Sequence, residues 1–305
     1  MKKDSIKYIA IFVIFIGLLL VSKFTDFNIQ DLFEEEKVEQ VSSPDLKIYF
    51  FDVGQAESIL ITNNGHNMII DGGNNVDGSL LVKYLKEELK ITKIDYIIST
   101  HPHEDHIGGL DNIIKNFEIA NLYMPDLTTT TKSFEDVIKA AEKKSLEVTI
   151  PENDETFTME DLKFKVIYTG TNEEDLNASS IILRMDYKDT SYLFTADTTY
   201  DTEQLILDKD IDVDVLKVAH HGSKHASSLN FLKKATPKYA IISCGKDNDY
   251  GYPHESAMNR LKQFTDKIYV TKDLGTIILT SDGTNIEISS IKTNLDGVEK
   301  KWNTQ

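Results

Sequence analysis

Cysteine is nearly absent from this sequence. The 305 residues contain one, Cys244, which excludes an internal disulfide framework and any zinc site built on paired cysteines. Proline and glycine are also sparse, with 6 and 15 residues, while hydrophobic residues make up 40% of the chain. These proportions exclude collagen-like, low-complexity and wholly disordered chains, and they are typical of a globular protein.

Positive charge is also scarce. The chain has 33 Lys and Arg residues against 50 Asp and Glu residues, which gives a formal net charge of −17. Proteins that bind nucleic acid mainly through its backbone use Lys and Arg to neutralise the phosphates. The charge therefore argues against a strong nucleic-acid-binding groove, although metal ions in an enzyme site would still supply positive charge locally.

One uncharged apolar run stands at the amino terminus. Residues 8–22 carry no charge, three lysines precede them, and Lys23 follows. As a helix this run spans about 22 Å, which is less than the roughly 30 Å of a bilayer's hydrocarbon core, but flanking lysines extend such a reach. We expect residues 1–24 to form a membrane-targeting helix, either an uncleaved signal anchor or a cleaved signal peptide.

The lysines also predict where the remainder of the chain lies. Because they precede the apolar run, the positive-inside rule leaves the amino terminus in the cytosol and exports the residues after Lys23. No clear small-residue cleavage site is present, which favours a domain anchored at the cell membrane over a secreted one. Residues 25–45 are acidic and end in Ser-Ser-Pro, and we expect them to link the anchor to one domain over residues 46–305.

Strand and helix patterns alternate from Leu46 onward. Apolar runs at residues 46–53, 57–62 and 67–71 are separated by turn residues, and the next segment, 79–90, has helical spacing. Further β-type runs and helical patterns follow, and several of the strands are joined as hairpins. This order predicts an α/β domain with two packed sheets and helices outside them, rather than one doubly wound parallel sheet.

A dense cluster of metal-binding residue types follows the apolar strand at residues 95–100. Four candidate ligands fall in six positions: His101, His103, Asp105 and His106. In an extended segment, residues two apart point the same way, so the first two histidines would face one point and the later Asp and His a second. Two such points suit a pair of metal ions about 3.5–4 Å apart. The alternatives are a solvated histidine cluster and a single structural metal, although structural zinc sites favour cysteine.

Several motifs appear together with this cluster in a recognisable order. They are DVGQ at 52–55, DGG at 71–73, HPHEDHIGG at 101–109, TAD at 195–197, VAHHGS at 218–223 and YGYPH at 250–254. The histidine motif resembles the signature of the metallo-β-lactamase-fold hydrolases. The whole order is similar to the exported hydrolase domain of ComEC-type competence proteins, which take up DNA. The resemblance covers nearly all of residues 46–290 and implies a four-layer αββα sandwich.

The resemblance implies a site for two divalent metal ions, Zn²⁺ or Mn²⁺. Its ligands would be His101 and His103 for the first ion, Asp105 and His106 for the second, Asp197 bridging both, and either His220 or His221 completing the second. We favour the first histidine of that last pair, because it continues the alternation of the strand through Leu216 and Val218. An alternative role for Asp197 is to cap a helix that follows it.

Two further positions depend on this resemblance. Asp71 would orient a ligand imidazole, as metal-bound histidines usually require, or would only turn the chain before Gly72. Asn177 lies where many family members carry a third histidine. It would offer an amide oxygen to the first metal, touch substrate, or cap a turn. Two imidazoles plus oxygens make a harder site, which is expected to accept Mn²⁺ alongside Zn²⁺.

The expected substrate side lies in the last two motifs. Ser223 would hold a phosphate oxygen. Relatives often have Gly-His-Pro where this chain has Tyr252 before Pro253, so Tyr252 or His254 would handle substrate or a proton. Four lysines near these motifs would form a local funnel or be ordinary surface residues. They are Lys217, Lys224, Lys233 and Lys234.

The implied reaction is hydrolysis by a hydroxide held between the metals, with Asp105 or Asp197 holding its proton. The preferred substrate is a phosphodiester, which makes the protein a phosphodiesterase or nuclease-like enzyme at the cell surface acting on a DNA strand. A smaller envelope ester, of the teichoic-acid or phosphocholine type, fits the negative charge better. A third hypothesis is a non-catalytic surface binding module with a degraded first metal site, which Asn177 and Tyr252 motivate.

Overall fold

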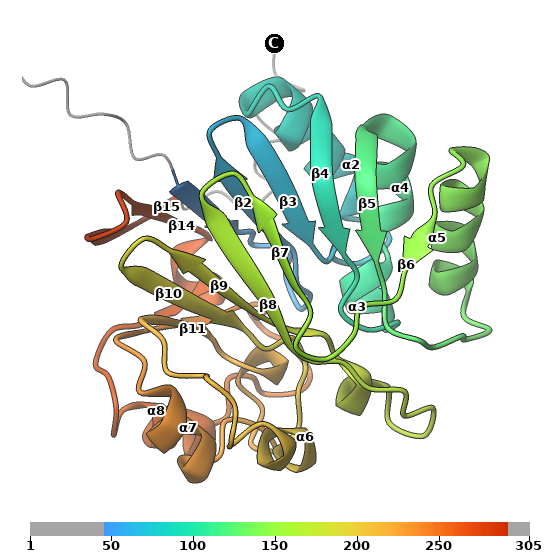
Figure 1. The fold of residues 1–305 in the computed structure, drawn as a ribbon. Helices are drawn as coiled ribbons and strands as arrows, with labels where there is room; N and C mark the ends of the chain where they lie inside the picture. Colours follow the sequence, from blue (N-terminus) through green and yellow to red (C-terminus); the bar gives the residue numbers. More distant parts are fainter. Residues whose placement is uncertain (1–45, 292–305) are drawn as a thin grey trace, which may run out of the picture. The chain divides into compact units, whose positions relative to one another are not determined.

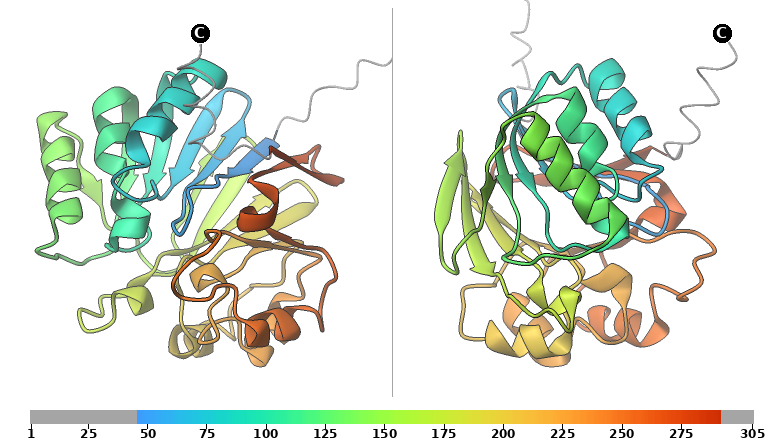
Figure 2. Two further views of the ribbon diagram at one scale, coloured as in Figure 1. Left: turned by 180° about the vertical axis from the view of Figure 1, so that it is seen from behind. Right: turned by 90° about the vertical axis from the view of Figure 1, so that its right-hand side faces the viewer.

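The computed structural model describes residues 46–291. The expected targeting segment at 1–24 and linker at 25–45 lie outside the described residues. Between residues 46 and 291, no helix combines the length and apolar character needed to cross a membrane. The two sheets and their helices, shown in Figures 1 and 2, agree with the predicted α/β class.

The first sheet mixes antiparallel and parallel strands. Its eight strands run in the spatial order β15-β14-β1-β2-β3-β4-β5-β6. In chain order they are β1 (Leu46–Phe50), β2 (Ile59–Asn63), β3 (His66–Ile70), β4 (Lys93–Ile98), β5 (Glu118–Tyr123), β6 (Val148–Thr149), β14 (Thr276–Ser281) and β15 (Ile286–Ile291). Pairing is antiparallel from β15 to β3 and parallel from β3 to β6. The parallel half is where helices connect the strands, as crossovers require.

The second sheet repeats this division. Its seven strands lie in the order β13-β12-β11-β10-β9-β8-β7. They are β7 (Thr156–Met159), β8 (Leu162–Tyr168), β9 (Ile182–Tyr187), β10 (Thr190–Phe194), β11 (Val215–Lys217), β12 (Tyr239–Ile242) and β13 (Ile268–Val270). Pairing is antiparallel from β7 to β10 and parallel from β10 to β13. Lys188 and Asp189 form the turn of the hairpin between β9 and β10.

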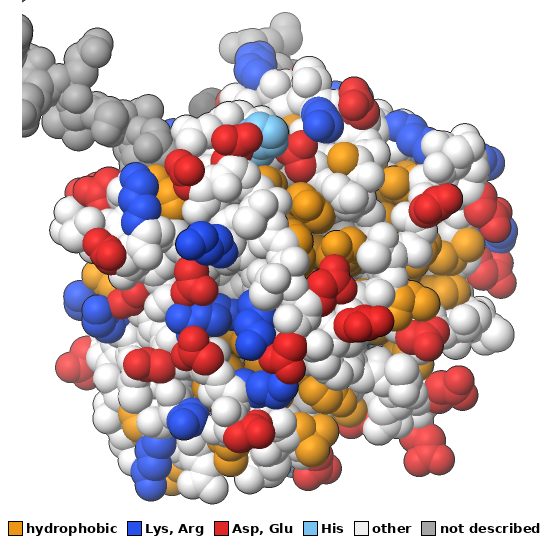
Figure 3. All heavy atoms as spheres, in the orientation of Figure 1, with side chains coloured by type: hydrophobic (Ala, Val, Ile, Leu, Met, Phe, Trp, Pro, Cys, Tyr) orange, Lys and Arg blue, Asp and Glu red, His pale blue; other side chains and the backbone are white. Residues whose placement is uncertain are grey.

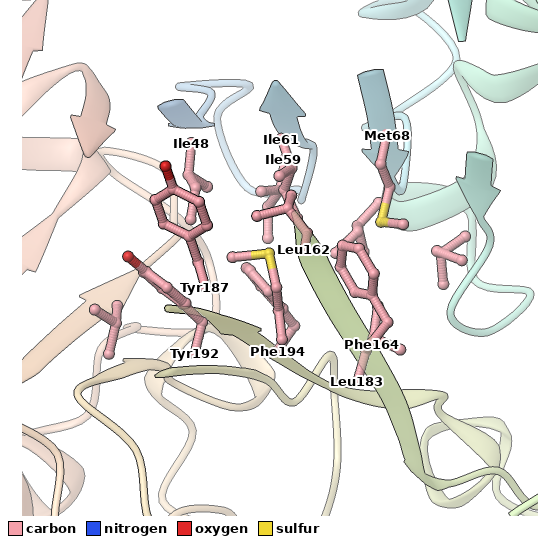
Figure 4. Packing of buried hydrophobic residues seen from close by; sticks show 14 of the residues in the cluster. Ile48, Ile59, Ile61, Met68, Leu162, Phe164, Leu183, Tyr187, Tyr192 and Phe194 are labelled. Carbon is pink, nitrogen blue, oxygen red and sulfur yellow. The ribbon is translucent and has the colours of Figure 1, made fainter. Parts of the chain in front are cut away.

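The main core lies between the two sheets. Ile48, Ile59 and Ile61 of the first sheet pack toward Phe164 and Tyr187 of the second, as Figure 4 shows. Alternate residues of these strands enter the core because successive side chains point to opposite faces of a sheet. The expectation of two packed sheets therefore holds.

Helices cover the outer face of each sheet. On the first sheet they are α2 (Gly78–Lys83) with its π-helical extension η2 (Tyr84–Glu88), α3 (Glu104–Ile107), α4 (Leu110–Asn116) and α5 (Lys132–Lys143). On the second sheet they are α6 (Tyr200–Leu205), α7 (Leu229–Ala235) and α8 (Glu255–Leu261). Separate apolar cores fill the space beneath each group. The order of layers is therefore helix, sheet, sheet, helix.

Helix α5 illustrates how the local sequence specifies these layers. The Thr131 side chain accepts a hydrogen bond from the Phe134 amide and caps the first turn. Phe134, Val137 and Ala141 recur at spacings of three and four, and all three are buried against the first sheet. This spacing forms one apolar stripe along the helix, so the helix packs with its charged side outward.

The motif residues follow the carboxyl ends of strands. Asp71 comes directly after β3, the histidine cluster follows β4, Asp197 follows β10, and the histidine doublet follows β11. Strands β3 and β4 are parallel neighbours, and so are β10 and β11. Loops from one edge of each sheet therefore meet, which is where sites form in open α/β sheets.

Candidate metal centre

Asp71 fixes the orientation of His106. Its Oδ1 accepts a hydrogen bond from the Thr100 amide at 2.8 Å, and its Oδ2 accepts from the Thr100 hydroxyl at 2.7 Å. The same Oδ2 lies 2.7 Å from Nδ1 of His106, and both side chains are completely buried. An imidazole that donates from Nδ1 to a carboxylate leaves Nε2 free to bind a metal. This contact is the one expected of an orienting carboxylate.

Close backbone packing holds these two loops together. The Gly72 amide donates to the His106 carbonyl at 2.6 Å, and the Gly109 amide donates to the Gly73 carbonyl at 3.2 Å. A Cβ built on Gly109 would lie 2.2 Å from the Gly72 carbonyl oxygen, closer than real Cβ contacts come. The glycines of both motifs are therefore needed for the close approach of the loops.

Four ligand-type side chains converge beyond His106. Asp105, His106, Asp197 and His221 each offer one atom, and these atoms all lie within 4.8 Å of one another. His106 Nε2 is 3.3 Å from Asp197 Oδ1, and His221 Nε2 is 3.4 Å from Asp105 Oδ2 and 3.6 Å from Asp197 Oδ2. A tetrahedral ion with bonds of about 2.0–2.2 Å has ligand-to-ligand edges of roughly 3.3–3.6 Å. We call these four residues the metal-ligand group.

The unpaired polar atoms of this group show whether a metal ion would fit it. Nε2 of His106, Nε2 of His221 and Oδ1 of Asp197 are buried, and within residues 46–291 the structure gives them no hydrogen-bond partner. Such atoms are costly to bury unless something satisfies them. The other ring nitrogen of His221 lies 2.8 Å from the Ser243 carbonyl, to which it donates, so Nε2 is the nitrogen that faces the group. A divalent cation satisfies all three atoms at once.

The charges of the group also call for a cation. Burial opposes a charge on His106, but Asp197, Asp71 and Asp105 outweigh that effect and raise its pKa well above the ordinary value. Burial likewise opposes a charge on His221, and Asp197 and Asp105 raise its pKa. Burial opposes ionisation of the two ligand aspartates, yet the imidazoles hold their pKa values below the ordinary one. The centre is thus electronegative, and a bound metal would take the place of the imidazole protons.

His101 and His103 form a separate pair beside this group. His101 Nε2 lies 3.0 Å from His103 Nδ1, and His101 Nδ1 lies 3.1 Å from the Thr100 hydroxyl. The rings of His101 and His106 are 4.1 Å apart between centroids. Burial and the nearby His106 hold the pKa of His101 well below its ordinary value. Both histidines of the pair therefore face one point, with His101 kept in the neutral form that metals bind.

The preference for His220 over His221 does not match the observed geometry. Strand β11 ends at Lys217, and both histidines then adopt left-handed backbone angles, with φ near 50°. Alternation along an extended strand no longer applies after such a turn, so the second histidine enters the metal-ligand group. His220 Nε2 instead lies 3.3 Å from the Tyr252 hydroxyl and 3.7 Å from Asp197 Oδ2. It borders the group from the more solvent-exposed side.

Comparison with known proteins agrees with this geometry. Residues 51–246 match the sequence profile of the metallo-beta-lactamase superfamily. The chain belongs to this superfamily. Its members are typically metal-dependent hydrolases, and the predicted family resemblance is confirmed.

Two bacterial proteins are similar over most of the chain. ComE operon protein 3 of Bacillus subtilis is 27% identical over 252 residues, which are 76% of this chain and 32% of the relative. Recombination protein 2 of Haemophilus influenzae is 27% identical over 262 residues, covering 84% of this chain and 31% of the relative. The matched part is thus about a third of the length of these relatives.

A solved structure shows the same fold. The metallo-beta-lactamase fold protein YhfI from Bacillus subtilis aligns over 80% of this chain and 100% of its own, with a TM-score of 0.53 and 14% identity. At this identity the likeness concerns the fold.

In this member of the superfamily, Asn177 lies on a short 3-10 helix, η3 (Leu176–Ser179). Its side-chain oxygen Oδ1 is buried, and among the described residues the structure gives it no hydrogen-bond partner. The segment that follows η3 is tied to the histidine loop, because the Ile181 amide donates to the Thr100 carbonyl at 3.0 Å. The amide of Asn177 donates to Asp175, which is the residue that caps this turn. The cap is therefore not Asn177, and its side-chain oxygen stays available.

The residues expected on the substrate side cluster around Tyr252. Its ring packs edge-on to His220 and His254, with centroids 5.8 Å and 5.2 Å away. Burial raises the pKa of the Tyr252 hydroxyl, while a hydrogen bond to Ser223 opposes that shift. Nδ1 of His254 accepts a hydrogen bond from the Lys224 amide at 3.0 Å, and His254 also begins α8. These side chains form one wall beside the metal-ligand group.

Lys217 is not a surface lysine. Its ammonium pairs with the Glu57 carboxylate, and both side chains are buried. The Glu57 amide donates to the Asp105 carbonyl at 3.0 Å, and Lys217 ends the strand that leads to His221. The pair therefore links the loop before β2 of the first sheet to the end of β11 in the second, next to the segments that supply Asp105 and His221. The sequence motifs do not predict this pair, whereas Lys224, Lys233 and Lys234 are exposed.

Asp197 does not cap a helix. The residue at the cap of α6 is Thr199, and the backbone of Asp197 follows a left-handed Ala196 instead. The Ala196 carbonyl accepts a hydrogen bond from the His220 amide at 2.9 Å, which joins the two loops that supply Asp197 and His221. The sole cysteine is also outside the chemistry, because burial raises the pKa of the Cys244 thiol to about 12.

Proposed function

We propose that this protein is a metal-dependent phosphodiesterase that cleaves a strand of nucleic acid, and that residues 1–24 hold its catalytic domain at the outer face of the cell membrane. The observation that carries the proposal is the buried metal-ligand group with its unpaired nitrogen and oxygen atoms. The relatives named as a ComE operon protein and a recombination protein support a substrate of nucleic-acid type.

The proposed ligands divide between two ions. His101 and His103 would hold the first, with Asn177 offering an oxygen, and Asp105, His106 and His221 would hold the second. Asp197 would be shared by the two sets. When bound, the ions would lower the pKa of a water and neutralise charge that develops on the attacked phosphate.

The chain's own groups would position the reactants. The Asp105 side chain is 33% exposed and Asp197 only 4%, so Asp105 is the carboxylate that can meet an incoming water. It remains ionised because the neighbouring imidazoles lower its pKa, and it can therefore accept a hydrogen bond from that water. Tyr252 and His254 line the wall where the substrate phosphate would lie, whereas Ser223 is buried and would act through its hydrogen bond with Tyr252.

A smaller phosphodiester is the second candidate. The net charge is −17, and on the face shown in Figure 3 basic and acidic side chains are interspersed, without a basic stripe. A short ester from the cell envelope, of the teichoic-acid or phosphocholine type, needs no such stripe. This observation favours small substrates over long duplex DNA.

The test is hydrolysis of bis-p-nitrophenyl phosphate by the full-length chain, stripped of metal and then reloaded with Zn²⁺ or Mn²⁺. We expect the metals to restore activity and His221→Ala to lower kcat/KM by at least about 100-fold. His66→Ala is the matched control, because His66 is the first residue of β3 and pairs with Asp95 and Glu160. Its activity should equal that of the unmodified chain.

Substrate comparison then separates the candidates. Faster turnover of single-stranded DNA than of glycerol or choline phosphodiesters supports the nuclease proposal, and the reverse order supports the envelope ester. A chain that binds no metal and hydrolyses none of these substrates would instead be a binding module.

A further inference from the structure

We propose that Tyr250 is a stacking platform for a nucleobase of a single-stranded nucleic acid whose scissile phosphate lies at the metal-ligand group. This inference rests on the proposed function and adds the way in which the strand is held. It comes from a column of rings that leads from the metal-ligand group to solvent.

The column begins inside the site. The His221 ring lies 5.4 Å from the His106 ring between centroids, and the Tyr252 ring stacks 6.0 Å beyond His221 at 28°. Tyr250 then stacks on Tyr252 at 5.3 Å and 10°. Tyr252 is 9% exposed, whereas Tyr250 is 64% exposed. The rings therefore pass from the buried ligands to the surface, where the outermost ring remains exposed.

The loop that carries these rings is held firmly. The Asn248 side chain accepts a hydrogen bond from the Tyr252 amide at 2.8 Å and donates to the Tyr252 carbonyl at 2.9 Å. The Lys272 ammonium donates to the same carbonyl at 3.0 Å. Gly251, between the two tyrosines, has φ of +72°, a conformation that glycine adopts without strain. The outer ring is thus presented by a fixed turn, so little ordering is needed on binding.

The length of the column indicates which part of a substrate would reach Tyr250. The ring centroids of His221 and Tyr252 are 6.0 Å apart, and those of Tyr252 and Tyr250 are 5.3 Å apart. The outer face of Tyr250 therefore lies well beyond any group esterified directly to a phosphate at His221. A base stacked there therefore belongs to a nucleotide further along the strand. Small phosphodiesters have no group that extends so far.

Charge explains why stacking suits this protein. The turn from residue 245 to 254 contains Lys246 but also Asp247 and Asp249, so it offers no excess of positive charge to track phosphates. Base stacking on an aromatic ring depends little on charge and tolerates every base. It also requires unpaired bases. The ligand class is therefore single-stranded nucleic acid bound without sequence preference.

The first experiment measures binding without catalysis. A fluorescent, phosphorothioate-linked oligothymidylate of eight nucleotides is titrated with the full-length, Mn²⁺-loaded chain, and Kd is read from fluorescence anisotropy. We expect Tyr250→Ala to raise Kd about tenfold. Tyr250→Phe, which keeps the ring, should stay within about twofold of the unmodified chain. Ile150→Ala is the control for loss of an exposed apolar side chain, because Ile150 is 51% exposed and follows β6 of the other sheet.

Equal affinity of Tyr250→Ala and the unmodified chain would overturn the inference, as would tighter binding of duplex than of single-stranded DNA. So would a chain that shows no binding of the single strand at micromolar concentration.

The second experiment separates this inference from the proposed function. For each variant, kcat/KM for an unmodified oligonucleotide is divided by kcat/KM for bis-p-nitrophenyl phosphate. Tyr250→Ala should lower this ratio about tenfold and Tyr250→Phe should preserve it. If the unmodified chain hydrolyses neither substrate, the proposed function fails, and the anisotropy titration still decides whether Tyr250 binds the strand. A preserved ratio in Tyr250→Ala overturns the platform while leaving phosphodiester hydrolysis in place.

Discussion

The two proposed metal positions are built in different ways. The metal-ligand group takes Asp105 and His106 from α3, which follows β4 of the first sheet, and Asp197 and His221 from two loops of the second. The other position takes His101 and His103 from a single turn after β4. The first arrangement depends on how the sheets meet, whereas the second depends on one short stretch of backbone. The two positions should therefore differ in metal affinity and in sensitivity to distant mutations.

The largest expected effect comes from replacing Lys217, which supports the metal-ligand group but is not one of its ligands. Lys217→Met leaves the Glu57 carboxylate buried without its partner, and we expect a loss of about 3–5 kcal/mol in the free energy of unfolding. Urea denaturation followed by circular dichroism measures this loss. The control is Lys238→Met, because the Lys238–Asp214 pair is exposed on its lysine side and should contribute less than about 1 kcal/mol. Equal effects of the two substitutions would contradict the role assigned to the buried pair.

Asp71→Asn should weaken the group by a smaller amount. It replaces the carboxylate that accepts a hydrogen bond from His106 Nδ1, and losses of such partners lower metal affinity about 10- to 100-fold. Isothermal titration with Zn²⁺ measures the change. The expected pattern is a selective loss at one of two sites, because the ring nitrogens of His101 contact Thr100 and His103 rather than Asp71. A uniform loss at both positions would mean that the loops do not act separately.

Asn177→His tests the other metal position, which His101 and His103 form. The pair of histidines lacks a third imidazole, and Asn177 has a buried oxygen without a partner in the described chain. A third imidazole should raise the affinity of the weaker position for Zn²⁺ by about tenfold and shift its preference away from Mn²⁺. Competition titrations with the two metals test this expectation, and Asn172→His serves as the control on the same loop. An unchanged preference would place Asn177 outside the first metal's ligands.

The smallest expected effect concerns pH in the absence of metal. The pKa values of His106 and His221 are raised in the folded chain, so their protonation stabilises the fold below about pH 6.5 and is lost as pH rises through the folded values. The lowered pKa values of Asp105 and Asp197 act only at acid pH, outside this window. The metal-free chain should lose a few degrees of Tm as pH rises from about 6.5 to about 9, and the loaded chain less. Calorimetry of both forms gives the slope of Tm against pH for each. Equal slopes would mean that no metal replaces those protons.

Much of the fold is predictable because its signals are local. The apolar runs that form β1, β2, β3 and β4 end at turn residues, and the spacing in residues 133–145 matches α5. The short strand β7 is not predictable in this way, because its four residues, Thr-Phe-Thr-Met, carry too little pattern by themselves. It is added to the sheet by pairing with β8.

The site is less predictable where it depends on distant segments or on backbone turns. The histidine motif and Asp71 can be recognised from their order along the chain. The preference for His220 over His221 does not match the geometry, because left-handed angles after Ala219 change which side chain enters the metal-ligand group. The sequence does not reveal that Lys217 is buried, because its partner, Glu57, belongs to a distant segment of the chain. No local pattern can reveal such a buried pair.

The position of β1 has a mechanical consequence. This strand opens the described chain at Leu46, yet it lies inside the sheet, with antiparallel neighbours β2 and β14 on its two sides. A pull applied through residue 45 along the strand axis would load both ladders in shear, so that their hydrogen bonds resist together and not one after another. If the preceding residues anchor the domain to a membrane, a force on a bound nucleic-acid strand would be opposed at β1, where the two ladders resist unfolding together.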